Sequence, residues 1–257
     1  MMNIRSFTRL KVFSILPVLF AVSVFTGCSD TITTQEPLPR GTMVGTATLY
    51  RVAKPVTDHS GIKVTLEESG MSTLTDQYGE FRFDDVATST YTLRYEKEGY
   101  SLIKQPMVSF VGGSIVRVSS TYLYAVPKCG SIFDDIRQID TSYIEAFAHA
   151  ACSELDSNIA FFNDHLLFVF SNSPDVGPEL DKHQFAMMGQ SPQPRGIASV
   201  FVSKQQLERY LDLDDSIFVA AFNTTGNNWV DPLTQRVIYS GHNLERDRTL
   251  AFKWHKE

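Results

Sequence analysis

The stretch TDQYGEFRF at residues 75–83 carries the strongest fold signal in this chain of 257 residues. Asp76 and Gly79 are residue types that form tight turns, Asp through local hydrogen bonds and Gly through positive φ. After the turn, Phe81 and Phe83 are separated by one polar residue, so both rings point to the same side of a strand. The stretch therefore predicts a turn between two strands, with two aromatic rings in a core.

Short apolar runs surround this stretch and recur every 8–12 residues or so from residue 43 to residue 125, which is typical of an all-β sandwich. Two of them alternate apolar and polar residues with a period of two, as half-buried strands do; their apolar residues are Ile62, Val64 and Leu66 in one run and Tyr91, Leu93 and Tyr95 in the other. Two further runs, at 107–111 and 115–118, flank Gly112-Gly113-Ser114. This pattern predicts a hairpin.

Residues 43–125 resemble the carboxypeptidase regulatory-like domain, a prealbumin-like β-sandwich. The family pattern T-D-x-x-G-x-F-x-F, followed by a Y-x-L strand, is matched by residues 75–83 and by Tyr91-Thr92-Leu93. Ser89 departs from the pattern, because the family usually has Gly there. The resemblance implies a module for folding support or display, and it does not imply peptide hydrolysis.

Residues 130–257 contain a second series of apolar runs, at 143–152, 166–171, 198–202, 217–222, 237–239 and 250–254. Ser203 and Gln206 form a capping-box pattern that predicts a short helix. The Ala-rich stretch 146–151 fits either a strand or a helix. The strand order is loosely similar to immunoglobulin-like domains of surface lipoproteins, so the whole chain is predicted to be all-β, with two tandem β-sandwich domains at 43–125 and 130–257.

The first 27 residues have a signal-peptide pattern, with three basic residues before an uncharged run from Val12 to Phe25. Phe25-Thr26-Gly27-Cys28 resembles the lipobox of bacterial lipoproteins, with Phe25 where Leu is usual. The resemblance implies that Cys28 carries a lipid and the new amino terminus an acyl group such as palmitate. Ser29, rather than Asp, follows Cys28, which favours the outer membrane, with the protein on its periplasmic side or on the cell surface. We expect a Bacteroidetes-type surface lipoprotein, with residues 28–42 as a tether. The alternative is an ordinary signal peptide with an accidental cysteine.

Charge argues against a nucleic-acid partner. The formal net charge is −6, and three of the 23 basic residues lie in the first 27 residues, which contain no Asp or Glu. Most of the acidity falls within residues 130–257. Binding the phosphates of a nucleic acid needs a surface on which basic residues cluster.

No catalytic motif is complete in the sequence. His242 and Glu245 match H-x-x-E, the start of a zinc carboxypeptidase site, but a catalytic zinc needs three protein ligands and the expected third is missing. We therefore predict no enzyme activity, no metal and no cofactor. The alternative is an enzyme with an unrecognised site in the second domain, and its mark would be histidines converging from His149, His165, His183 and His242.

Cys129 and Cys152 are the cysteines that remain when Cys28 is acylated. In an exported protein they are candidates for a disulfide, and two buried free thiols are the alternative. A thiol nucleophile at Cys152 activated by His149 is disfavoured, because residues three apart face opposite sides of a strand.

Trp229 lies beside Asn228 in a segment rich in Gly, Asn and Asp, with Tyr239 following. An exposed ring beside amide groups suits a sugar, whereas a ring folded into the core is the structural alternative. The chain is therefore predicted to be a non-enzymatic, lipid-anchored envelope protein that acts as a binding or scaffold module. Its expected partners are the membrane through Cys28, and a polysaccharide or an envelope protein. A more specific alternative is a glycan-binding accessory lipoprotein of a polysaccharide-uptake system.

Overall fold

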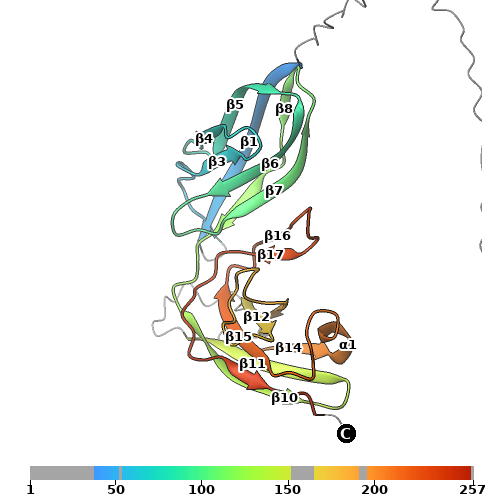
Figure 1. The fold of residues 1–257 in the computed structure, drawn as a ribbon. Coiled ribbons are helices and arrows are strands. Elements are labelled where there is room, and N and C mark those ends of the chain that lie inside the picture. Colours follow the sequence, from blue (N-terminus) through green and yellow to red (C-terminus); the bar gives the residue numbers. More distant parts are fainter. Residues whose placement is uncertain (1–37, 52–53, 152–164, 191–195, 256–257) are drawn as a thin grey trace, which may run out of the picture. The chain divides into compact units, whose positions relative to one another are not determined.

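The structure is a computed structural model that describes residues 38–51, 54–151, 165–190 and 196–255 (Figure 1). The regular elements in these ranges are strands, apart from one helix of four residues, α1 (Lys204–Leu207). The all-β prediction is confirmed. Within the described ranges, no helix has the length and apolarity needed to cross a membrane.

Residues 38–125 form two sheets. In the first, β1 lies in the middle; it pairs antiparallel with β2 and β5 and parallel with β8 and β9. The strands of this sheet are β1 (Arg40–Arg51), β2 (Lys54–Pro55), β5 (Glu80–Ala87), β8 (Ile115–Arg117) and β9 (Thr121–Tyr124). The second sheet has the order β4 (Ser72–Leu74), β3 (Lys63–Leu66), β6 (Ser89–Glu96) and β7 (Ile103–Phe110).

The core of this half contains the residues that were predicted for it from the sequence. Phe81 and Phe83 are buried with their ring centroids 6.0 Å apart, and the Phe81 ring meets Tyr95 edge-on at 5.8 Å. The turn before them forms as predicted, because the Asp76 carboxylate accepts hydrogen bonds from two backbone amides and Gly79 has φ of 81°. The alternating residues of β3 and β6 are also buried.

The predicted hairpin at residues 107–118 is wrong. Gly112 and Gly113 do have positive φ, but β7 pairs with β6 in one sheet while β8 pairs with β1 in the other. The glycine turn therefore crosses between the two sheets. Moreover, β1 begins at Arg40, inside the stretch expected to be tether.

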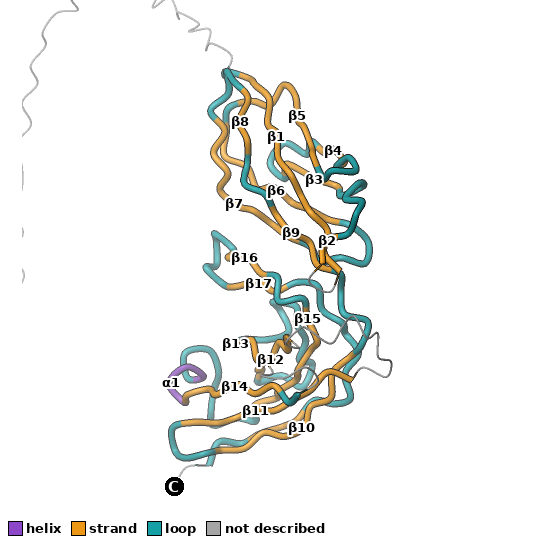
Figure 2. Tube along the Cα trace, turned by 180° about the vertical axis from the view of Figure 1, so that it is seen from behind, coloured by secondary structure: helices purple, strands orange, loops and turns teal. Residues whose placement is uncertain are grey.

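Residues 130–255 contain one antiparallel sheet of seven strands (Figure 2). Their order is β10 (Gly130–Gln138), β11 (Tyr143–Ala151), β14 (Ala198–Ser203), β13 (Phe185–Gln190), β12 (His165–Ser171), β15 (Ile217–Thr224) and β18 (Leu250–Phe252). The sheet curls, so that Ser131 of β10 donates a hydrogen bond from its hydroxyl to the carbonyl of Ala221 on β15. A separate hairpin consists of β16 (Asn228–Val230) and β17 (Val237–Tyr239).

The curled sheet encloses an apolar cluster on its inner side, distinct from the core of the first half. Residues 143–151 are a strand, which settles the alternative left open by the Ala-rich sequence: Ile144, Ala146 and Ala148 face the inner cluster. The predicted capping box is present, with Ser203 and Gln206 bonding each other's backbone amides at the start of α1.

Candidate ligand-binding surfaces

Three neighbouring strands, β10, β11 and β14, carry polar and aromatic side chains on the outer side of the curled sheet. Register pairs Arg137 with Glu145, and Glu145 with Phe201. Tyr143 and Phe147 lie two positions on either side of Glu145, and alternate residues of a strand share a side. We call these five residues, Arg137, Tyr143, Glu145, Phe147 and Phe201, the aromatic face.

An ion pair lies among the rings of the aromatic face. The guanidinium of Arg137 contacts the carboxylate of Glu145 at 3.0 Å and stands 4.5 Å from the centre of the Phe147 ring. Glu145 is 7% exposed, whereas Tyr143 is 47% and Phe201 58% exposed. Two rings are therefore open to solvent beside an exposed guanidinium that Glu145 holds in place.

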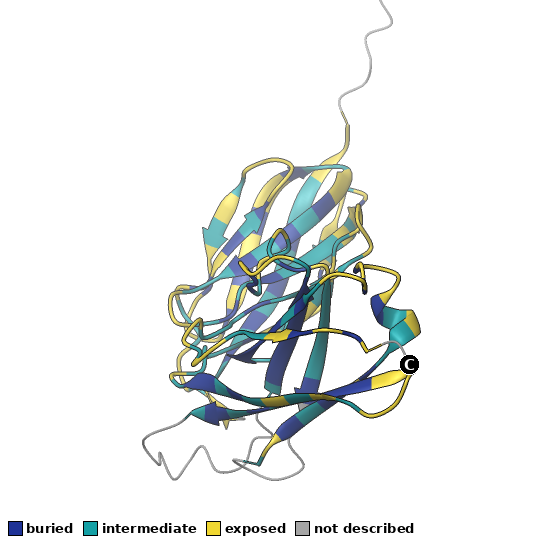
Figure 3. Cartoon of the chain, turned by 60° about the horizontal axis from the view of Figure 1, so that its bottom comes forward, coloured by how far each residue is buried: buried dark blue, intermediate teal, exposed yellow. Residues whose placement is uncertain are grey.

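The rest of the outer side is covered. Leu167, Val169 and Phe222 lie on the strands β12 and β15 and are buried, with Val176 and Tyr239 packed on them. The segment after β12 and the β16–β17 hairpin thus shield this part of the sheet. Figure 3 colours the chain by the burial of each residue. Among the described residues, neither Tyr143 nor Phe201 belongs to a buried apolar cluster.

The three residues proposed from the sequence for a glycan lie on the β16–β17 hairpin. Register pairs Asn228 with Tyr239 and Trp229 with Ile238. Because successive residues face opposite sides, Trp229 lies on the other face of the hairpin from Asn228 and Tyr239. Trp229 is half-buried, and burial raises the pKa of the Tyr239 hydroxyl. The hairpin does not bring the three side chains onto one platform.

The base of this hairpin is tied to the first half of the chain. The Asn227 amide donates hydrogen bonds to the Ser101 hydroxyl at 2.7 Å and to the Tyr122 carbonyl at 3.2 Å. The Ser240 hydroxyl donates to the Leu102 carbonyl at 2.5 Å. Part of the polar segment that suggested sugar binding therefore serves contacts within the protein.

The histidines do not assemble a metal site among the described residues, where no group of three His, Cys, Asp or Glu side chains could share an ion. His149 lies 2.9 Å from the Asp134 carboxylate. Burial is the main cause that lowers the pKa of both His183 and His242, and a charge on His183 lowers the pKa of His242 further. His183 donates from Nδ1 to the Gly177 carbonyl at 3.0 Å.

The cysteine predictions are only partly covered by the structure. Cys28 and Cys152 lie outside the described residues. The Asn223 amide donates hydrogen bonds to the carbonyl of Cys129 at 3.1 Å and to its sulfur at 3.4 Å.

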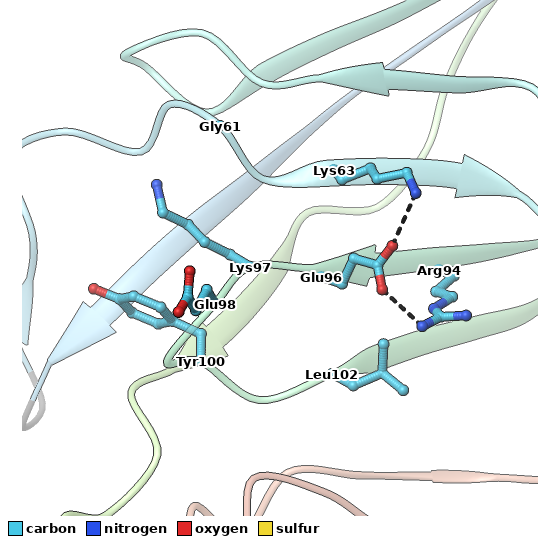
Figure 4. A pocket seen from close by; sticks show the side chains of 8 residues that line it. All are labelled: Gly61, Lys63, Arg94, Glu96, Lys97, Glu98, Tyr100 and Leu102. Atoms are coloured by element: carbon cyan, nitrogen blue, oxygen red, sulfur yellow. Dashed lines mark hydrogen bonds and ion pairs between the residues drawn. The ribbon is translucent and has the colours of Figure 1, made fainter.

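A hollow of about 500 Å³ lies at the end of β3 and β6 (Figure 4). Its charged groups bind one another: Glu96 contacts Lys63 at 3.3 Å and Arg94 at 2.7 Å. Lys97 donates to the carbonyl of Ser60. The hollow is lined mainly by charged side chains and a single ring, Tyr100, whereas the aromatic face carries two exposed rings, so the aromatic face is the better candidate for stacking a ligand.

Sequence reasoning missed every residue of the aromatic face. The signal was present, because Tyr143, Glu145 and Phe147 alternate with Ile144 and Ala146, which is the pattern of a strand with two different sides. Because apolar residues lie on both sides of this strand, its sequence looks the same as that of a strand buried on both sides.

No protein-family model matches this sequence, and no curated protein matches it. Among solved structures, it is similar to a chain of a type II cohesin–X-dockerin complex from Acetivibrio cellulolyticus, with 25% identity and a TM-score of 0.30. That likeness covers 34% of this chain, which spans 58% of the other chain's length.

Two proteins from Bacteroides uniformis are similar over more of the chain. One is a candidate carbohydrate-binding protein, 11% identical, with a TM-score of 0.32, covering 84% of this chain and 99% of that one. The other is a DUF3823 family protein, 11% identical, with a TM-score of 0.31 and the same coverage. At these low scores the likenesses identify neither a family nor a ligand for this chain.

Proposed function

We propose that this chain is a non-enzymatic, lipid-anchored module of the bacterial cell envelope that binds a saccharide chain on its aromatic face. The observation that carries the proposal is the position of the Arg137–Glu145 pair among the rings of Tyr143, Phe147 and Phe201. Aromatic rings stack on the apolar side of a sugar, and the exposed guanidinium of Arg137, held by Glu145, can donate hydrogen bonds to the sugar's hydroxyls. An open sheet surface also suits an extended chain better than a small molecule, which favours an enclosed pocket.

Affinity electrophoresis of the full chain in gels that contain a panel of envelope and plant polysaccharides tests the binding. We expect at least one polysaccharide to retard the protein, and the double substitution Tyr143→Ala and Phe201→Ala to weaken binding by about tenfold or more, since it removes two stacking rings. Tyr78→Ala is the matched control, because Tyr78 is an exposed aromatic residue in the first half. It should leave retardation unchanged.

Two results would contradict the saccharide proposal. One is the absence of retardation by every polysaccharide; the other is retardation that the double substitution leaves intact. If Trp229→Ala alone abolished the retardation, the sugar would bind at the β16–β17 hairpin, as the sequence first suggested.

The lipid anchor is a separate part of the proposal and rests on the resemblance of Phe25-Thr26-Gly27-Cys28 to a lipobox. The attached acyl chains would hold the protein on a membrane, since each buried methylene contributes about 0.8 kcal/mol. Cys28→Ala should move the protein from the membrane fraction to the soluble fraction. Retention in the membrane fraction would contradict the anchor.

A further inference from the structure

Three exposed apolar side chains gather at the end of the first half where β1 begins. They are Leu38, Val111 and Ile115. Leu38 lies two residues before the start of β1, Val111 follows β7, and Ile115 is the first residue of β8. We call these three residues the apolar end.

Backbone contacts hold the apolar end together. The Thr88 hydroxyl lies 2.8 Å from the carbonyl oxygens of both Pro39 and Val111, which joins the chain beside Leu38 to the end of β7. The next residues are joined as well, because the Gly113 amide donates to the Arg40 carbonyl at 2.9 Å. Ile115 is fixed nearby by its register with Thr42 of β1. The three exposed residues thus lie on segments that hydrogen bonds and register hold together at one end of the sandwich.

Charged groups near this end are paired with each other. Arg40 contacts Asp85 at 2.5 Å, and Arg82 contacts Asp84 at 2.7 Å. The surroundings of the apolar end therefore carry no excess negative charge that an anionic lipid surface would repel.

Chain length brings this end close to the lipid. Leu38 lies ten positions after Cys28, and an extended chain spans at most about 3.6 Å for each step. A lipid on Cys28 would therefore keep the apolar end within about 36 Å of the bilayer. Isolated apolar side chains on a surface need no explanation, but a rigid group beside a membrane tether does.

We propose that the apolar end rests on the membrane, with Leu38, Val111 and Ile115 inserted among the lipids, so that the sandwich is oriented as well as tethered. This inference rests on the proposed anchor at Cys28. The proposal assigns the apolar end to lipid. The alternative is that a second copy of the chain covers the apolar end.

Depth-dependent fluorescence quenching tests the contact. The full lipidated chain carrying Ile115→Trp is reconstituted on phosphatidylcholine vesicles whose acyl chains are brominated. The matched control is Leu74→Trp, because Leu74 and Ile115 are similarly exposed, at 62% and 65%, and Leu74 lies on β4 of the other sheet. The native Trp229 and Trp254 give the same background in both variants.

We expect brominated lipid to remove most of the added emission at position 115 and none of it at position 74. Vesicle-bound protein with no quenching at position 115, or with equal quenching at both positions, would overturn the membrane contact while leaving the anchor intact. Protein that does not sediment with the vesicles would refute the anchor and the contact together. If the tryptophan at position 115 is already shielded from solvent in protein without vesicles, the surface would be assigned to a second copy of the chain instead.

Discussion

Arg137 bonds the carboxylate of Glu145 at 3.0 Å and lies over the ring of Phe147 at 4.5 Å. Glu145 is nearly buried although it stands on the outer side of the sheet. A carboxylate shielded by aromatic neighbours is costly unless a cation balances it. Arg137 therefore makes the arrangement of the aromatic face possible, and it is itself partly held by a cation–π contact.

Replacing Arg137 tests this relationship through stability. Arg137→Met keeps an apolar stem but removes the hydrogen bond and the positive charge, so we expect the free energy of unfolding to fall by about 1–2 kcal/mol. Urea unfolding followed by circular dichroism measures it. Adding Glu145→Gln should recover part of the loss, because the buried group then carries no charge.

The matched control for Arg137→Met is Arg82→Met. Arg82 pairs with Asp84 at 2.7 Å, but both side chains are exposed, and such pairs contribute little to stability. We expect no measurable change. Equal effects at positions 82 and 137 would show that Glu145 does not depend on its partner.

Gly79 is the position where a side chain should do most harm. It has φ of 81°, and a Cβ atom there would collide with the backbone carbonyl of Ala47 on β1. Gly79→Ala should lower the free energy of unfolding by about 2 kcal/mol or more, since it adds a clash to an unfavourable φ. Thermal and urea unfolding of the purified variant measure the loss.

Gly70→Ala separates the two causes. Gly70 has a similar φ of 71°, but no atom lies within 4 Å of the position its Cβ would take. We expect only the cost of the positive φ, about 1 kcal/mol. If Gly70→Ala destabilised the protein as much as Gly79→Ala, the contact with β1 would not matter.

The sequence predicted the first half well because its signals are local. The turn residues Asp76 and Gly79 and the alternation of Phe81 and Phe83 involve neighbours in the chain. The partner of β8 was missed, because pairing with β1 joins residues far apart in sequence. The aromatic face was missed for the same reason: Glu145 meets Phe201 only through the register of β11 and β14.

Histidine burial predicts that stability declines in mild acid. The pKa of His183 and of His242 lies below the ordinary 6.5, mainly because burial disfavours the charged ring. Below about pH 6.5 the unfolded chain therefore binds protons that the folded chain does not, and the free energy of unfolding falls as the pH decreases through this range. Melting temperatures from pH 8 to pH 5 measure the decline.

Substitutions that keep the hydrogen bonds should flatten this pH dependence. His183→Asn can still donate to the Gly177 carbonyl, and His242→Gln to the Tyr239 carbonyl, which now accepts from Nε2 at 2.9 Å. His255→Asn, at an exposed position, is the control and should retain the wild-type slope. A double variant with the wild-type slope would place the acid sensitivity in other groups.

The register of β10 and β11 supports a disulfide between Cys129 and Cys152. Gly130 pairs with Ala151, Cys129 and Cys152 are the next residues in the sequence beyond this pair, and Cys129 is disulfide-bonded. Directly opposed residues of antiparallel strands have Cα atoms about 4.5–5.5 Å apart, which a disulfide can bridge.

Peptide mapping without reduction should recover the two cysteines in one linked fragment. Reduction should lower the free energy of unfolding by about 3 kcal/mol. In the double variant with Cys129→Ala and Cys152→Ala, a reducing agent should leave the free energy of unfolding unchanged. Alkylation of both thiols in the unreduced protein would contradict the disulfide.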